Sequence, residues 1–254
     1  VDPVDGVYCI PNVKTNILLQ CHFLRRDMSI DLSLDQKDIL EKSLKLVHAL
    51  VDIISTYSWL TPVLLAMELS QMIVQACLVK DSNLYQLPHF DRELVEKCKD
   101  SRIKDIGDLL EMDDEPRQRL LGLNQKQLDN VAQVCNKIPN YEIEVEVSKT
   151  NEETGEVFLT INIQGDEGEG EEDDEDDDKT VYAPFYPKEK QEQWWLIIAD
   201  EREKKLLSIK RTSAKSGAKT KISFTPSESG NKNYTAMLVC DSYIGCDVTE
   251  QFSL

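Results

Sequence analysis

The spacing of apolar residues changes at Pro139 and Asn140, and this change constrains the fold more than any other feature of the sequence. Before it, apolar residues recur every three or four positions, which is typical of one face of a helix. After it, apolar and polar residues alternate, as in a strand with one buried face. A helical part followed by a strand part predicts an α+β chain of more than one domain.

Residues 1–100 are expected to form a helical bundle. The apolar spacing predicts helices over residues 13–26, 33–57, 61–80 and from Asp91 onward. Ser33 and Gln36 have the spacing of a capping box. Thr61 followed by Pro62 is typical of a helix start, because Thr caps well and Pro is tolerated at the first helical position.

Residues 101–138 are expected to form a small helix-loop-helix domain, with short helices over 103–110, 113–121 and 124–137. Asn124 and Gln127 again have capping-box spacing. The turn at residues 121–124 resembles a helix-hairpin-helix phosphate-binding turn, in which paired glycines present backbone N–H groups. Here Asn124 stands at the second glycine position, and residues 100–137 carry eight acids against six bases. A structural hairpin is therefore the favoured interpretation.

Residues 139–254 are expected to form an immunoglobulin-like or fibronectin type III-like β-sandwich of about seven strands. The apolar runs that predict these strands are 141–147, 157–163, 181–186, 194–199, 206–210, 219–225, 234–240 and 248–253. Trp194 or Trp195 would supply the large inward-facing aromatic side chain of a central strand.

The acidic residues are concentrated in one insertion of this expected sandwich. The chain has 47 Asp and Glu against 29 Lys and Arg, which gives a formal net charge of −18, and residues 165–178 hold eleven of these acids and no base. Without those eleven negative charges the net charge would be −7. The charge excludes a protein that holds nucleic acid by a bulk basic footprint. The insertion is either a disordered, solvated loop extension or a docking segment for a basic partner.

The sequence carries no recognisable catalytic or metal-binding motif. The string nearest to a Walker A motif, residues 216–220, lacks the upstream glycine, and G-x-S-x-G and H-E-x-x-H are both missing. Seven cysteines form no C-x-x-C pair, and the three histidines are scattered. The acids at 113–115 precede Pro116 at an expected helix start, where the helix dipole favours negative charge. We therefore expect no catalytic residue, no cofactor and no metal ligand.

The sequence also suggests where the chain resides. It opens at VDPVDGVY, without the charged and apolar regions of a secretory signal. The most apolar stretch, residues 59–79, is interrupted by polar side chains, so no membrane span is expected. An odd number of scattered cysteines favours reduced thiols inside the cell. A nuclear or cytosolic location is expected.

The helix expected over 61–80 carries the one candidate binding surface. It is apolar around most of its circumference, which predicts a central, largely buried helix. Its polar residues Thr61, Glu68, Gln71 and Gln75 lie at offsets of seven, three and four, which places them in one narrow stripe. This stripe is either a polar seam facing a bound strand or partner, or the solvent edge of a core helix.

Several strings together resemble a known family. Those in the helical part are residues 18–23 (LLQCHF), 59–60 (WL), 66–72 (AMELSQM) and 86–90 (QLPHF). They are similar to the helical part of the Sec-sixty-three homology unit. Those in the strand part are residues 194–198 (WWLII), 207–211 (LSIKR), 233–235 (NYT) and 240–247 (CDSYIGCD). They resemble the carboxy-terminal sandwich of the same unit in the spliceosomal members of the Ski-two-like helicase family.

The resemblance implies a function that the residues alone do not. In that family the unit follows the helicase core of large superfamily two RNA and DNA helicases, and a variant occurs in an endoplasmic reticulum translocation protein. A chain similar to the second, carboxy-terminal unit is expected to be a noncatalytic, nuclear module of an ATP-dependent RNA helicase that acts in pre-mRNA splicing and spliceosome activation. Its expected partners are its own helicase cassette and other spliceosomal proteins, and not a membrane.

The resemblance also bears on the polar stripe. In active relatives a long helix of the bundle lies along the translocating single strand as a ratchet, and the helix that matches it here is 61–80. Its seam of Thr61, Glu68, Gln71 and Gln75 contains no Lys or Arg, so weak or no direct RNA binding is expected. The alternatives are a single-stranded nucleic-acid-binding ratchet module of a related helicase, and the corresponding domain of the translocation protein.

Overall fold

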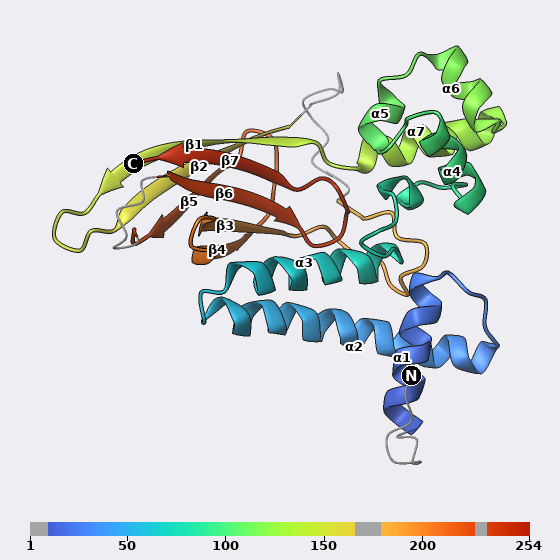
Figure 1. The fold of residues 1–254 in the computed structure, drawn as a ribbon, viewed down its shortest axis with the longest axis horizontal. Helices are drawn as coiled ribbons and strands as arrows, with labels where there is room; N and C mark the ends of the chain where they lie inside the picture. The colour runs from blue at the N-terminus through green and yellow to red at the C-terminus, as the bar shows by residue number, and fades with distance from the viewer. Residues whose placement is uncertain (1–9, 166–178, 227–232) are drawn as a thin grey trace. The chain divides into compact units, whose positions relative to one another are not determined.

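The computed structural model describes residues 10–165, 179–226 and 233–254 (Figure 1). Helices occupy the first part of the described chain and two antiparallel sheets the second, so the expected α+β class is confirmed. The expectations for the acidic insertion concern residues 166–178, which lie outside the described residues.

The described residues divide into two compact units, each assembled from separate stretches of chain. The first unit comprises the residues up to 47, 72–135 and 182–189, and the second comprises 48–71, 136–181 and 190–254. The three-part division expected from the sequence, with boundaries near 100 and 138, stays a prediction.

The expected helices are all present, with ends that differ by a few residues. They are α1 (Ile10–Phe23), α2 (Ile30–Ser55), α3 (Leu60–Gln75), α4 (Arg92–Asp100), α5 (Ile106–Leu110), α6 (Asp114–Leu121) and α7 (Gln125–Lys137), with a short 3-10 helix, η1 (Asn83–Gln86). The largest difference is at the end of α3, which was expected to reach Lys80. The helix ends earlier because Ala76 has a left-handed φ of 50°.

The expected capping boxes had opposite outcomes. In α7 the box is confirmed, because the Asn124 side chain accepts from the Gln127 backbone N–H at 3.0 Å and the Gln127 side chain accepts from the Asn124 N–H at 3.0 Å. The box at Ser33 is wrong, because α2 begins at Ile30 and Ser33 lies inside the helix. The Gln36 side chain instead donates to the Leu18 carbonyl oxygen at 2.8 Å, which ties α2 to α1 within the first unit.

The strands form two antiparallel sheets. Their bounds are β1 (Tyr141–Thr150), β2 (Val157–Gly165), β3 (Trp194–Asp200), β4 (Lys205–Thr212), β5 (Lys219–Phe224), β6 (Asn233–Cys240) and β7 (Val248–Ser253). One sheet has the order β1-β2-β5 and the other β4-β3-β6-β7. The strand expected over 181–186 is wrong, because residues 181–183 have no regular structure and residues 184–186 form a turn and a bend. Pro184 and Pro187 lack the backbone N–H groups that a ladder requires.

The central strands β3 and β6 of the four-stranded sheet are buried on both faces, which explains the continuous apolar run of β3. Trp194 and Trp195 point to opposite faces because successive side chains of a strand alternate. Trp194 packs edge-on against Tyr141 of β1, with ring centroids 5.4 Å apart, so it faces the three-stranded sheet. Trp195 belongs to a core cluster with Val51 of α2 and Met67 of α3. The second unit thus has three layers, with the four-stranded sheet in the middle.

Candidate functional site

The four polar residues of α3 do not share one surface. Thr61 is exposed and Glu68 is half-buried, whereas the side chains of Gln71 and Gln75 are only 3% and 2% exposed. Gln71 donates to the Cys240 carbonyl oxygen at 2.9 Å and lies 3.0 Å from each carboxylate oxygen of Asp247. Gln75 donates to the Tyr182 carbonyl oxygen at 3.4 Å. The stripe therefore has an exposed beginning and a buried end that is bonded to the chain itself.

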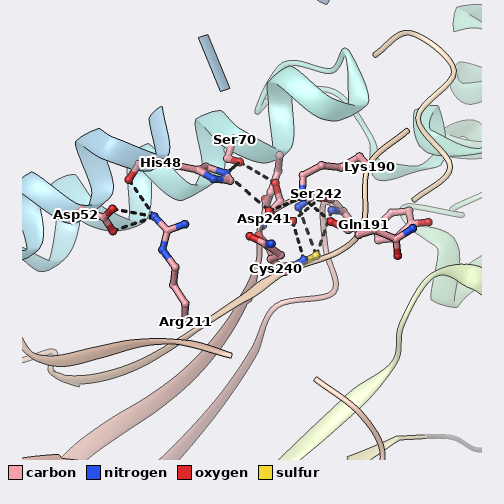
Figure 2. A network of polar contacts seen from close by, with 12 residues as sticks. His48, Asp52, Ser70, Lys190, Gln191, Arg211, Cys240, Asp241 and Ser242 are labelled. Atoms are coloured by element: carbon pink, nitrogen blue, oxygen red, sulfur yellow. Dashed lines mark hydrogen bonds and ion pairs between the residues drawn. The ribbon is translucent and has the colours of Figure 1, made fainter. Parts of the chain in front are cut away.

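A denser polar network lies where β6 ends, and sequence reasoning missed it (Figure 2). At its centre is Asp241, which is 1% exposed. Lys190 Nζ donates to Asp241 Oδ2 at 2.6 Å, while Oδ1 accepts from the Gln193 backbone N–H at 3.0 Å and from the Ser242 hydroxyl. Both carboxylate oxygens have partners and the charge is neutralised, which a buried carboxylate requires. The signal in the sequence was an acid directly after the apolar run of residues 236–240.

His48 of α2 joins this network as a neutral donor. Its Nε2 lies 3.1 Å from Ser70 Oγ and 3.7 Å from Asp241 Oδ2. Burial lowers the pKa of His48, and although the Asp241 carboxylate opposes this, Lys190 and Arg211 add to the lowering. The Ser70 hydroxyl donates its single proton to the Asp241 carbonyl oxygen at 2.8 Å, so it must accept from His48 Nε2–H.

The serine, histidine and aspartate of this network do not form a nucleophilic relay. A relay needs an unprotonated ring nitrogen facing the hydroxyl and the opposite nitrogen facing the carboxylate. Here one nitrogen, Nε2, faces both Ser70 and Asp241, and that nitrogen carries the proton. Ser70 is also fully buried, at 0% exposure. The network instead connects α2, α3 and β6 within the second unit.

A surface ion pair extends the same network. Arg211 of β4 donates to the Asp52 carboxylate of α2 at 2.9 and 3.0 Å and to the His48 carbonyl oxygen at 3.3 Å. Its guanidinium carbon lies 5.9 Å from the centre of the Trp195 ring. Both charged partners are exposed, so this pair contributes little stability, on the order of 0–1 kcal/mol.

The described ranges hold no candidate metal site. These residues include no cluster of three or more His, Cys, Asp or Glu side chains that could hold a metal ion. The cysteines among them are free thiols, and burial raises the pKa of Cys77 and of Cys135 to about 11, which disfavours the reactive thiolate. Within the same ranges, every helix is too short or too polar to cross a membrane.

An exposed apolar surface lies on the second unit where α2 turns into α3. We call Leu50, Ile53, Tyr57 and Trp59 the hairpin-tip patch. Their exposed fractions are 42%, 58%, 61% and 54%, and the Tyr57 and Trp59 rings stack with centroids 5.0 Å apart. The backbone at the patch is fixed, because Ser58 O accepts from Leu206 N–H at 3.0 Å and Leu60 N–H donates to Lys204 O at 3.3 Å.

These features define a mixed helical and β-sheet module that uses its buried polar groups to hold its own elements together and leaves apolar side chains at its surface. The model of the Sec63 Brl domain family matches residues 2–253. The chain belongs to that family.

Three relatives illustrate the similarity. The chain is 39% identical over 246 residues to the U5 small nuclear ribonucleoprotein 200 kDa helicase of Homo sapiens. It is 42% identical over 251 residues to the DExH-box ATP-dependent RNA helicase DExH12 of Arabidopsis thaliana, and 36% identical over 244 residues to the pre-mRNA-splicing factor brr2 of Schizosaccharomyces pombe. These alignments cover 95% to 96% of this chain but only 11% of each relative.

Proposed function

We propose that this chain is a noncatalytic module of a spliceosomal ATP-dependent RNA helicase. In this proposal it acts in the nucleus during pre-mRNA splicing and spliceosome activation, packs on the helicase cassette of its own polypeptide, and is a platform for other spliceosomal proteins. The names of the relatives and the alignment of 96% of this chain to the human helicase support the assignment.

The observation that carries the packing role is the hairpin-tip patch. Contiguous exposed apolar side chains on a soluble domain commonly mark a protein interface. Stacked Tyr and Trp side chains are typical of the residues that dominate binding energy at such interfaces. The backbone hydrogen bonds at Ser58 and Leu60 fix the patch before binding, so little conformational entropy would be lost on docking.

We further propose that the strand part is a fibronectin type III-like sandwich. The first, second and fifth strands form one sheet, and the fourth, third, sixth and seventh form the other. In the constant-type immunoglobulin fold the fourth strand pairs with the fifth instead. Pairing of the fourth strand with the third therefore favours the fibronectin arrangement. The helical bundle of residues 1–100 and the helix-loop-helix domain of residues 101–138 remain part of this proposal.

The absence of catalysis is tested on the isolated chain. We expect no ATP hydrolysis above background, with or without RNA, and no unwinding of a paired RNA duplex. An active helicase cassette from a relative, assayed beside it, shows that the conditions support activity. RNA-stimulated hydrolysis by the pure chain would contradict the proposal.

The packing role is tested by mixing the chain with the helicase cassette of the Homo sapiens relative. We expect co-elution in size-exclusion chromatography, and a loss of affinity of at least about tenfold for Ile53→Asp, because a charge would be buried in an apolar contact. Val147→Asp on β1 is the matched control, since Val147 is similarly exposed, at 47%. Equal binding by Ile53→Asp and the unchanged chain would refute this interface.

The competing function is a module that grips single-stranded RNA along α3. Only the Thr61 and Glu68 part of its stripe reaches the surface, and neither side chain can neutralise a phosphate. Titration with a labelled oligouridylate at low and physiological salt distinguishes RNA gripping from the proposed protein-interaction role. Micromolar binding that weakens steeply with salt would favour gripping.

A further inference from the structure

The first unit contains a basic surface hollow, although the whole chain has a net charge of −18. The hollow has a volume of about 460 Å³ and is lined by four cationic side chains, those of Arg25, Arg26, Lys80 and Arg92. We call these residues, with the apolar side chains between them, the basic hollow. Among the residues lining it, only Asp81 and Asp91 are acidic.

Both acidic side chains that line the hollow accept a hydrogen bond from a backbone N–H group. Asp81 Oδ2 accepts from the Leu78 backbone N–H at 2.9 Å. Asp91 Oδ1 accepts from the Leu94 N–H at 2.8 Å and so caps α4. Their positions are explained by local turns and helix capping. Neither forms an ion pair with a cation of the hollow within the described part of the chain.

Three of the four cationic side chains have no ion-pair partner among the residues that the structure describes. The side chains of Arg26, Lys80 and Arg92 are exposed, and none makes a hydrogen bond or ion pair with any residue that the structure describes. Elsewhere on the first unit, exposed cations such as Lys14, Lys42 and Lys99 do pair with a carboxylate. Four cationic and two acidic side chains line the basic hollow, so its local charge is positive.

Arg25 has a different role, because its guanidinium contacts the backbone and the aromatic rings that form one side of the hollow. Its guanidinium donates to the carbonyl oxygens of Ala76, Gln75 and Tyr85 at 3.1, 3.0 and 2.8 Å. Its central carbon lies 5.0 Å from the Tyr85 ring centre and 4.4 Å from that of Phe185. These contacts hold an aromatic wall in place beside the free cations, and Phe185 stays 44% exposed.

We propose that the basic hollow binds an acidic peptide segment of a protein partner. Its carboxylates would pair with Arg26, Lys80 and Arg92, since guanidinium and ammonium groups form charge-assisted hydrogen bonds with carboxylates. An apolar side chain of the same segment would pack on the exposed Phe185 ring and on Leu24, which is 48% exposed.

A peptide fits the hollow better than a nucleic acid does. Nucleic acid is held by an extended basic footprint that neutralises many phosphates. Here the free cations surround one hollow, whose volume matches a few side chains. The inference rests on the proposed role as an interaction platform, but it does not involve the hairpin-tip patch.

The test measures fluorescence anisotropy of a labelled peptide that carries six acidic residues around one leucine. We expect saturable binding to the chain, weaker binding at high salt, and a loss of affinity of at least about tenfold for the double variant Arg26→Glu and Lys80→Glu. Lys126→Glu is the control, because Lys126 is also an exposed cation of the first unit but does not line the hollow. Circular dichroism melts verify that every variant is folded.

Two further probes identify the occupant. A peptide with the acids replaced by Gln and Asn should not bind, and one with glycine in place of leucine should bind more weakly. Unchanged peptide binding by the double variant, an equal loss in Lys126→Glu, or tighter binding of an oligouridylate than of the peptide would each overturn the proposal. Failure here is distinguishable from failure of the cassette interface, because Ile53→Asp should retain peptide binding and the double variant should retain the cassette.

Discussion

Lys190 and Asp241 form an ion pair in which the lysine is the carboxylate's principal counter-charge. Their side chains are 14% and 1% exposed. Lys190→Met would leave the carboxylate buried, with only His48, the Gln193 N–H and the Ser242 hydroxyl nearby. Burial lowers the pKa of His48 in the folded chain, so the imidazole is a poor substitute for the lost ammonium group. We expect the free energy of unfolding to fall by about 3 kcal/mol, as measured by urea denaturation.

Two variants control this prediction. Adding Asp241→Asn to Lys190→Met should recover most of the loss, because the uncompensated charge is removed together with its partner. Arg211→Met breaks the exposed pair with Asp52 and should cost no more than about 1 kcal/mol. If Lys190→Met costs as little as Arg211→Met, the buried network is not an important contributor to stability.

Gln71 is expected to control the titration of Asp247. Burial raises the pKa of Asp247 above its usual 3.8, while the hydrogen bonds from the Gln71 side chain and the Cys240 backbone N–H oppose the increase. The Asp247 carboxyl group therefore stays protonated to a higher pH in the folded chain than in the unfolded chain. Stability falls as pH rises from 3.8 through the folded-state pKa, and this loss is complete above that pKa.

Gln71→Leu removes one of the two opposing hydrogen bonds, so the folded-state pKa of Asp247 rises further. We expect the variant to be less stable than the unchanged chain, with a deficit that is largest near about pH 7 and smaller near about pH 4.5. Urea denaturation of the variant and of the unchanged chain at the two pH values measures this deficit. In an Asp247→Asn background the deficit should no longer depend on pH. A deficit that persists unchanged at acidic pH would show that Gln71 acts through packing alone.

Among the helices, α7 offers the sharpest prediction for a single element. Its reciprocal cap between Asn124 and Gln127 satisfies two backbone N–H groups that the helix itself leaves unpaired. We expect Asn124→Ala to lower the free energy of unfolding by about 1 kcal/mol. Gln125→Ala, which removes only an exposed side-chain bond to Asp129, should cost about 0.3 kcal/mol. Equal costs in thermal unfolding would mean that the cap does not hold the helix start.

Helices and strands were predictable because their periodicity is a local property, but their caps were less so. Ser33 and Asn124 have the same spacing to a Gln, yet only Asn124 caps. The N–H of Ser33 donates to the Ser29 carbonyl oxygen, so the helix had already begun upstream of the expected cap. The segment 181–186 was mistaken for a strand on its aromatic and apolar content, although Pro184 within it and Pro187 directly after it argue against pairing.

The buried glutamines could not be placed from sequence. A polar stripe on an amphipathic helix is normally its solvent edge, and for Thr61 that holds. Gln71 and Gln75 are buried because carbonyl and carboxylate groups from distant parts of the chain accept their hydrogen bonds. Contacts of this kind join residues more than a hundred positions apart, so no local pattern reveals them. Lys190 lies 51 positions from Asp241, so the position of Asp241 after an apolar run could mark the acid but not its partner.

The charge of the whole molecule is set largely by one segment. Eleven of its acids lie in residues 166–178, whose removal would change the formal net charge from −18 to −7. Charges outside a binding site still act on a ligand through the long-range field, over roughly 10 Å at 0.1 M salt. A net charge of −18 should therefore weaken the binding of any polyanion to the chain, including an acidic peptide.

Replacing those eleven acids with Asn and Gln tests this effect without changing the length of the chain. We expect both the acidic peptide and an oligouridylate to bind several-fold more tightly at about 50 mM salt, with the gain shrinking at about 300 mM because screening shortens the field. Fluorescence anisotropy titrations at the two salt concentrations measure it. A variant with residues 166–178 in scrambled order keeps the charge and should bind as the unchanged chain does. If scrambling alters affinity as much as neutralisation, the segment acts through its specific sequence and not through its charge.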